Sequence, residues 1–328
     1  MADFEQQLSL PEPVAVRSGV WRDYVQLAKL RLNGLVLVTT LAGYLLAGGG
    51  LTDPFTLAAA LSGAALAAIG AGALNQYLER DVDRRMKRTA DRPLPAGRLS
   101  AQQALVFGST CVAGGVLLLA LRVNLLSGFL CVLTAVAYLF VYTPLKFKGP
   151  VATLVGAVPG GIPPMIGWAA ARGELSVGAW VLFAILFTWQ LPHFFAIAWI
   201  YRDDYRRAGM PMISHLDRDG LRTAQQIIMC TLNLLFVSLL PVPIGLADGV
   251  YFFEALLLGA AFLALGVRFA RQRTLSRARH VLFGSLIYLP SLLILWLIAA
   301  LKYDPMTEPV AAGCLPQRGA FASRVAVL

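Results

Sequence analysis

The chain has 328 residues, of which 58% are hydrophobic and 14% are charged. About a quarter of the residues in a soluble domain are charged, and they help to cover its surface. This composition therefore excludes an ordinary soluble domain. The net charge of +10 would suit a nucleic-acid-binding protein, but the positive residues follow membrane topology instead, and no nucleic-acid partner is expected.

Nine apolar stretches are long enough to cross a membrane as helices. A hydrocarbon core of about 30 Å takes roughly 20 residues per helix, and stretches of this length without two-residue alternation argue against a β-barrel. They cover residues 33–51, 55–78, 102–121, 125–143, 151–170, 177–199, 224–246, 250–269 and 282–301. The sequence therefore predicts an all-α polytopic membrane protein with nine transmembrane helices.

The positive residues predict how these helices are oriented. With the N-terminus in the cytoplasm, 23 of the 28 lysine and arginine residues fall on the inner side. This asymmetry is the positive-inside rule. We expect a cytoplasmic segment (1–32), one membrane domain (33–301) in the cell (inner) membrane, and a poorly ordered outer tail (302–328).

An acidic cluster follows the second stretch. Asn75, Glu79 and Asp83 have i, i+4 and i+8 spacing and would lie along one helix face. Three oxygen ligands near the membrane suit Mg²⁺ with substrate phosphates. Basic side chains that would bind phosphate oxygens follow at Lys87, Arg88 and Arg92. The alternative is a solvated helix whose arginines only set the topology.

A second cluster follows the sixth stretch and lies on the same predicted side. Asp203 and Asp204 are flanked by Arg202, Arg206 and Arg207. By itself this segment is also typical of a surface loop. Two acidic and basic clusters on one face, however, favour a diphosphate site with one or two Mg²⁺ ions.

Three further features lie in or near the membrane. Lys146 ends the fourth stretch and would reach either lipid headgroups or phosphate. The segment 160–168 contains paired glycines and prolines, which indicate either a simple kink or a broken helix that lines a cavity. His193 is either held by a neighbouring helix or free to act as an axial haem ligand or proton carrier. His215 and His280 are expected at the cytoplasmic surface.

These motifs resemble those of UbiA-type intramembrane prenyltransferases. The Asn75, Glu79 and Asp83 stripe is similar to the first signature of that family. Gln76 departs from the usual carboxylate at its position. With that departure, segments 79–95, 142–146, 160–168, 192–194 and 204–212 resemble the branch that farnesylates haem.

The resemblance implies nine helices around a central cavity, with farnesyl diphosphate and haem b as substrates and Mg²⁺ as cofactor. It implies Mg²⁺ binding and catalysis by Asn75, Glu79, Asp83, Asp203 and Asp204. The implied substrate-binding residues are Lys87, Arg88, Arg92, Tyr142, Lys146, His193 and Arg202. Haem-copper oxidase assembly or a haem A synthase would use the product.

Two other functions remain open. The same enzyme class could act on another aromatic or tetrapyrrole acceptor. A polytopic transporter would also have many spans, a broken fifth helix and buried polar residues, although it would not need two acidic clusters on one face.

Overall fold

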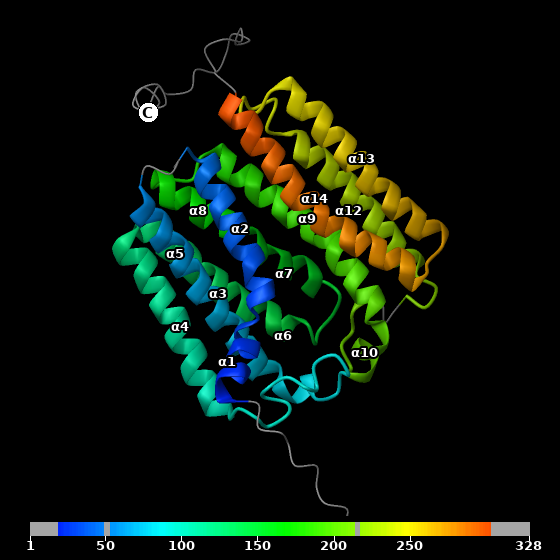
Figure 1. The fold of residues 1–328 in the computed structure, drawn as a ribbon. Helices are drawn as coiled ribbons and strands as arrows, with labels where there is room; N and C mark the ends of the chain where they lie inside the picture. Colours follow the sequence, from blue (N-terminus) through cyan, green and yellow to red (C-terminus); the bar gives the residue numbers. More distant parts are fainter. Residues whose placement is uncertain (1–18, 49–52, 214–216, 303–328) are drawn as a thin grey trace, which may run out of the picture.

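The computed structural model describes residues 19–48, 53–213 and 217–302, and this part of the chain is helical without strands (Figure 1). The helices are α1 (Val20–Ala28), α2 (Leu30–Leu46), α3 (Pro54–Asp83), α4 (Ala101–Arg122), α5 (Leu125–Val136), the π-helix η1 (Ala137–Tyr142), α6 (Thr143–Leu145), α7 (Ala152–Gly161), α8 (Pro163–Arg172), α9 (Val177–Ile200), α10 (Arg202–Arg207), α12 (Leu221–Leu239), α13 (Gly249–Arg271) and α14 (Leu275–Lys302). The predicted all-α class is confirmed. Residues 1–18, His215 and the tail from residue 303 lie outside the described residues.

The number of spans agrees with the sequence only approximately. Within the described ranges, seven helical runs are long and apolar enough to cross a membrane, or eight if α1 and the bulk of α2, bent by 48°, count as one span. The predicted span 224–246 corresponds to α12, whose first turns carry Arg222, Gln225 and Gln226 and lower its hydropathy. This helix ends at Leu239, before Pro241 and Pro243.

Polar caps fix where several of the helices begin. Asp53 accepts a hydrogen bond from the Thr56 amide at 3.0 Å, and Pro54 begins α3. Ser100 and Gln103 form a reciprocal capping box at the start of α4. These residues set the connections at both ends of the α3–α4 pair.

The segment 160–168 breaks the fifth predicted span, as expected. Helix α7 ends at Gly161 and α8 begins at Pro163. Gly160 and Gly167 leave no room for a Cβ, because the Gln190 side chain and the Thr40 carbonyl oxygen approach their backbones. These two glycines therefore allow close packing of α7 on α9 and of α8 on α2.

Two hydrophobic clusters divide the bundle. One is built mainly from α9, α12, α13 and α14, and the other from α2, α3, α4, α5 and α8. The segment after α3 and helix α10 lie at the same end of the bundle as α1, whereas α14 ends at the opposite end (Figure 1). The two acidic segments thus share one face, as the topology requires.

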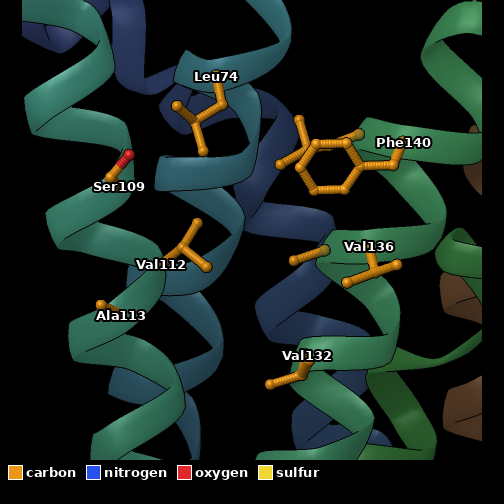
Figure 2. Close-up of a pocket in the computed structure, with 9 residues that line it drawn as sticks. Leu74, Ser109, Val112, Ala113, Val132, Val136 and Phe140 are labelled. Atoms are coloured by element: carbon orange, nitrogen blue, oxygen red, sulfur yellow. The ribbon is translucent and has the colours of Figure 1, made fainter.

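An apolar groove of about 270 Å³ runs between α4 and the α5–η1 run, over α3. Figure 2 shows Val112 of α4 and Val132, Val136 and Phe140 from the other side around it. Its lining carries no charged side chain, so the groove differs chemically from the acidic end of the bundle.

Candidate active site

The predicted stripe lies on the last turns of α3. This helix continues without a break to Asp83, so Asn75, Glu79 and Asp83 share one face. Their exposed fractions are 2%, 4% and 0%. Two carboxyl groups buried this deeply would be costly without cationic partners, because ions lose their hydration on burial.

The partners come from two other segments. Lys146 Nζ donates to Glu79 Oε1 at 2.6 Å, and Arg92 Nη1 donates to Asp83 Oδ2 at 2.6 Å. Asn75 Nδ2 donates to Thr143 Oγ1 at 3.1 Å. Two of the predicted phosphate-binding residues therefore meet the predicted metal ligands.

Lys146 is the most enclosed of these basic residues. Its ammonium lies 4.6 Å from the centre of the Tyr142 ring. Desolvation opposes the charged form, but Tyr142 and Glu79 outweigh it and raise the pKa of Lys146. Lys146 is therefore a positive charge held beside Glu79 and does not extend to lipid headgroups in this structure.

The stripe can accept a divalent cation on its oxygen atoms. Asp83 Oδ1 is buried and has no hydrogen-bond partner in the described part of the chain. A carboxylate oxygen without a donor, beside Glu79 and Asn75, is a hard-oxygen environment of the kind that Mg²⁺ prefers. No three His, Cys, Asp or Glu side chains converge among the described residues. Lys146 and Arg92 neutralise the two carboxylates of the stripe instead.

The second acidic segment forms the short helix α10. Asp204 is largely buried and accepts a hydrogen bond from Arg207. Asp203 is exposed and pairs with Arg206 at 3.7 Å. Arg202 lies 4.4 Å from the centre of the Trp199 ring. In this arrangement neither aspartate joins the α3 stripe in a metal cluster.

The segment after α3 nevertheless packs against α10. The Arg88 guanidinium lies 4.6 Å from the centre of the Tyr201 ring and 5.8 Å from that of Tyr205. A small apolar cluster of Met86, Ala208, Met210 and Met212 lies alongside. Arg88 therefore has a packing role here, whereas Lys87 is exposed.

Lys29 is a neighbour of the site that the sequence analysis missed. It joins α1 to α2 with a φ of 48°, the one positive φ of a non-glycine residue in the described ranges. Its charge interacts with those of Glu79, Asp83, Lys146 and Arg92. Gln76 Nε2 donates to the Leu27 carbonyl oxygen at 2.9 Å and ties this junction to the stripe. The sequence feature that could have identified Lys29 is its position between an amphipathic segment and the first apolar stretch.

The family model for UbiA prenyltransferases matches residues 36–300. The chain belongs to the UbiA prenyltransferase family. The protoheme IX farnesyltransferase of Solibacter usitatus (strain Ellin6076) is 48% identical over 278 residues, covering 82% of this chain and 95% of that protein. The enzyme of the same name from Opitutus terrae (strain DSM 11246 / JCM 15787 / PB90-1) is 43% identical, covering 83% and 92%.

Solved structures of UbiA relatives share the fold. A digeranylgeranylglyceryl phosphate synthase superimposes with a TM-score of 0.72 at 15% identity, over 86% of this chain and 99% of the other. A UbiA homologue from Archaeoglobus fulgidus, bound to DMAPP and Mg²⁺, gives a TM-score of 0.60 at 16% identity, over 85% and 99%. At these identities the likeness concerns the fold alone.

His193 lies apart from the acidic residues of this UbiA chain. It is in α9, seven residues before Ile200, or ~10 Å along the helix axis from that end. Its Nδ1 atom lies 2.8 Å from Ser285 Oγ on α14. A residue of a neighbouring helix therefore contacts one ring nitrogen, which agrees with the interpretation that a neighbouring helix holds this histidine. His280 is exposed.

Proposed function

We propose that this protein transfers the farnesyl group of farnesyl diphosphate to a vinyl group of haem b, in a Mg²⁺-dependent reaction. The observation that carries the proposal is the 48% identity to a protoheme IX farnesyltransferase over 95% of its length. The buried stripe on α3, with its basic partners and the unpartnered Asp83 oxygen, supplies the chemistry that the diphosphate needs.

Asn75, Glu79 and Asp83 would hold the metal, whereas Asp203 and Asp204, which pair with Arg206 and Arg207 in this structure, would have to leave those partners to join them. Bound Mg²⁺ would neutralise charge on the diphosphate. Lys146 and Arg92 would donate hydrogen bonds to its oxygen atoms as negative charge grows on the leaving group. Lys87, Arg88 and Arg202 would guide the diphosphate at the rim, and Tyr142 would keep Lys146 in place.

The reaction itself replaces one bond by another. The farnesyl C1–oxygen bond breaks and diphosphate leaves with the electron pair. The terminal carbon of the vinyl group bonds to C1, water adds to the cation left on the other vinyl carbon, and one proton is released. The buried setting of the stripe keeps water from the allylic cation before the carbon–carbon bond forms.

We further propose that the acidic segments face the cytoplasm from a cell (inner) membrane, with the chain end at Lys302 on the outer side. The distribution of lysine and arginine supports this orientation. Farnesylated haem would then be passed to haem-copper oxidase assembly or to a haem A synthase.

The test is an incubation of purified protein with haem b, farnesyl diphosphate and Mg²⁺, followed by mass spectrometry of the extracted haem. We expect a hydroxyethylfarnesyl haem in the wild type. We expect a loss of ~10²-fold or more in Glu79→Gln and in Asp83→Asn, because each removes charge at the reacting diphosphate. EDTA should also abolish the product.

Asp81→Asn is the matched control, since Asp81 lies between the stripe residues in sequence but its side chain is exposed. Its activity should stay near that of the wild type. Mg²⁺-dependent binding of farnesyl diphosphate without any haem product would point to another aromatic or tetrapyrrole acceptor. Absence of both binding and product would reject the proposal.

A further inference from the structure

The imidazole of His193 is held from several sides in the middle of the membrane domain. It stacks on Trp189 one turn earlier, with ring centres 5.2 Å apart and an interplanar angle of 27°. The Phe194 ring meets it edge-on at 5.9 Å. Its Nδ1 atom lies 2.8 Å from Ser285 Oγ. These contacts fix the plane and the rotation of the ring.

The hydrogen bonds of Ser285 determine which nitrogen of His193 carries the proton. Ser285 Oγ donates to the Leu282 carbonyl oxygen at 2.6 Å, and a carbonyl oxygen can only accept. A serine hydroxyl has one hydrogen, so Oγ must accept from His193 Nδ1–H. In the neutral ring the lone pair is therefore on Nε2.

Ser285 is itself immobilised. Its exposed fraction is 0%, and its carbonyl oxygen accepts a hydrogen bond from Trp189 Nε1 at 2.7 Å. Two side chains of α9, one turn apart, thus bind one residue of α14. The serine is rigid enough to orient the imidazole rather than follow it.

The Nε2 atom has no such partner. No hydrogen bond reaches it within the described ranges, and it is not among the buried polar atoms that lack a partner, so it remains open at the half-buried ring edge. Lipid offers no hydrogen-bond donor at this depth, and an unsatisfied polar atom inside the membrane is costly. An oriented lone pair in this position calls for an electron-pair acceptor.

We propose that His193 Nε2 binds the iron of haem b as an axial ligand, with Ser285 as a positioning residue. A metal-bound histidine usually donates its other N–H to an oxygen atom, which fixes the tautomer and makes the ring a better ligand. The position ~10 Å from the end of α9 would put the iron at the depth of a membrane-spanning helix. This inference rests on the proposed function and adds how the acceptor is held.

The experiment is a titration of ferric haem b into the full-length protein in detergent, followed by absorption, electron paramagnetic resonance and, after reduction, resonance Raman spectroscopy. We expect a histidine-ligated spectrum in the wild type and in His280→Ala, which removes an exposed histidine. His193→Gly should lose that spectrum, and added imidazole should restore it.

Ser285→Ala tests the positioning role without removing the ligand. The histidine spectrum should persist, but the iron–histidine stretching frequency should fall, because Nδ1–H loses its acceptor and the ring becomes a weaker donor. Ser285→Thr, which keeps a hydroxyl, should return the frequency toward the wild-type value. An unchanged frequency in Ser285→Ala would overturn the assignment of Ser285.

The same preparations separate this inference from the proposed function. If the wild type forms farnesylated haem but His193→Gly gives the wild-type haem spectrum, the iron ligand is elsewhere and only the inference fails. If the wild type neither forms product nor shows a histidine-ligated spectrum, both fail. Product together with a spectrum that requires His193 supports both.

Discussion

The side chains of Glu79 and Lys146 show how buried charge is managed at this site. The two groups form an ion pair at 2.6 Å, and their side chains are 5% and 13% exposed. Such a pair contributes little net stability compared with an apolar pair of the same size. Removal of one member is different, because the other is left as an uncompensated charge away from water.

We therefore predict that Lys146→Met lowers stability by about 3–5 kcal/mol. The double variant Lys146→Met with Glu79→Gln should recover most of this loss while remaining inactive. Thermal unfolding in detergent, in the presence of EDTA so that no cation replaces the ammonium, measures the effect. A single variant as stable as the double one would show that the two residues are not coupled.

At the level of the helices, the α3–α4 pair depends on glycines that allow close backbone approach. A Cβ at Gly115 would lie 2.5 Å from the Gly63 carbonyl oxygen, and one at Gly70 would lie 2.5 Å from the Gly108 carbonyl oxygen. Small residues at such crossings give van der Waals contact where lipid supplies no hydrophobic driving force. This packing holds the helix that carries the stripe.

Gly115→Ala should consequently destabilise the protein by about 1–3 kcal/mol, the usual cost of forcing an extra carbon into a packed contact. A Cβ at the adjacent Gly114 would have no neighbouring atom within 4 Å, so Gly114→Ala on the same helix is the control. That change should be neutral or slightly stabilising, because alanine favours helix. Equal unfolding temperatures for the two variants would contradict the packing argument.

At the scale of the whole molecule, the side of the membrane on which Gln272 and Lys302 lie depends on whether α12 crosses the membrane. Its first turns are polar, yet it packs along α9 and α13 within the larger hydrophobic cluster. With α12 spanning, the turn at Gln272 is cytoplasmic and Lys302 is outside. Without it, the two positions exchange sides.

Reporter fusions distinguish these arrangements. We predict that alkaline phosphatase is active when fused after Lys302 and inactive when fused after Gln272, with green fluorescent protein giving the reverse pattern. The positive residues around the α13–α14 turn, including Arg271, Arg273 and Arg277, favour this result. The opposite pattern at both junctions would remove α12 from the spanning helices.

The sequence alone determined the all-α membrane class, the shared face of the two acidic segments and the stripe on α3. These follow from periodic or additive properties, namely apolar length, charge distribution and helical spacing, which need no knowledge of long-range packing. The sequence did not determine the exact number of spans, because a helix such as α12 is buried by its neighbours rather than by its own hydropathy.

The tertiary structure decided how separate segments meet. It paired Lys146 with Glu79 and Arg92 with Asp83, brought Lys29 to the site, and set Arg88 between two tyrosines. It also brought His193 into contact with Ser285, a residue 92 positions further along the chain. Such contacts depend on the packing of distant helices, whose register is not encoded in any local pattern.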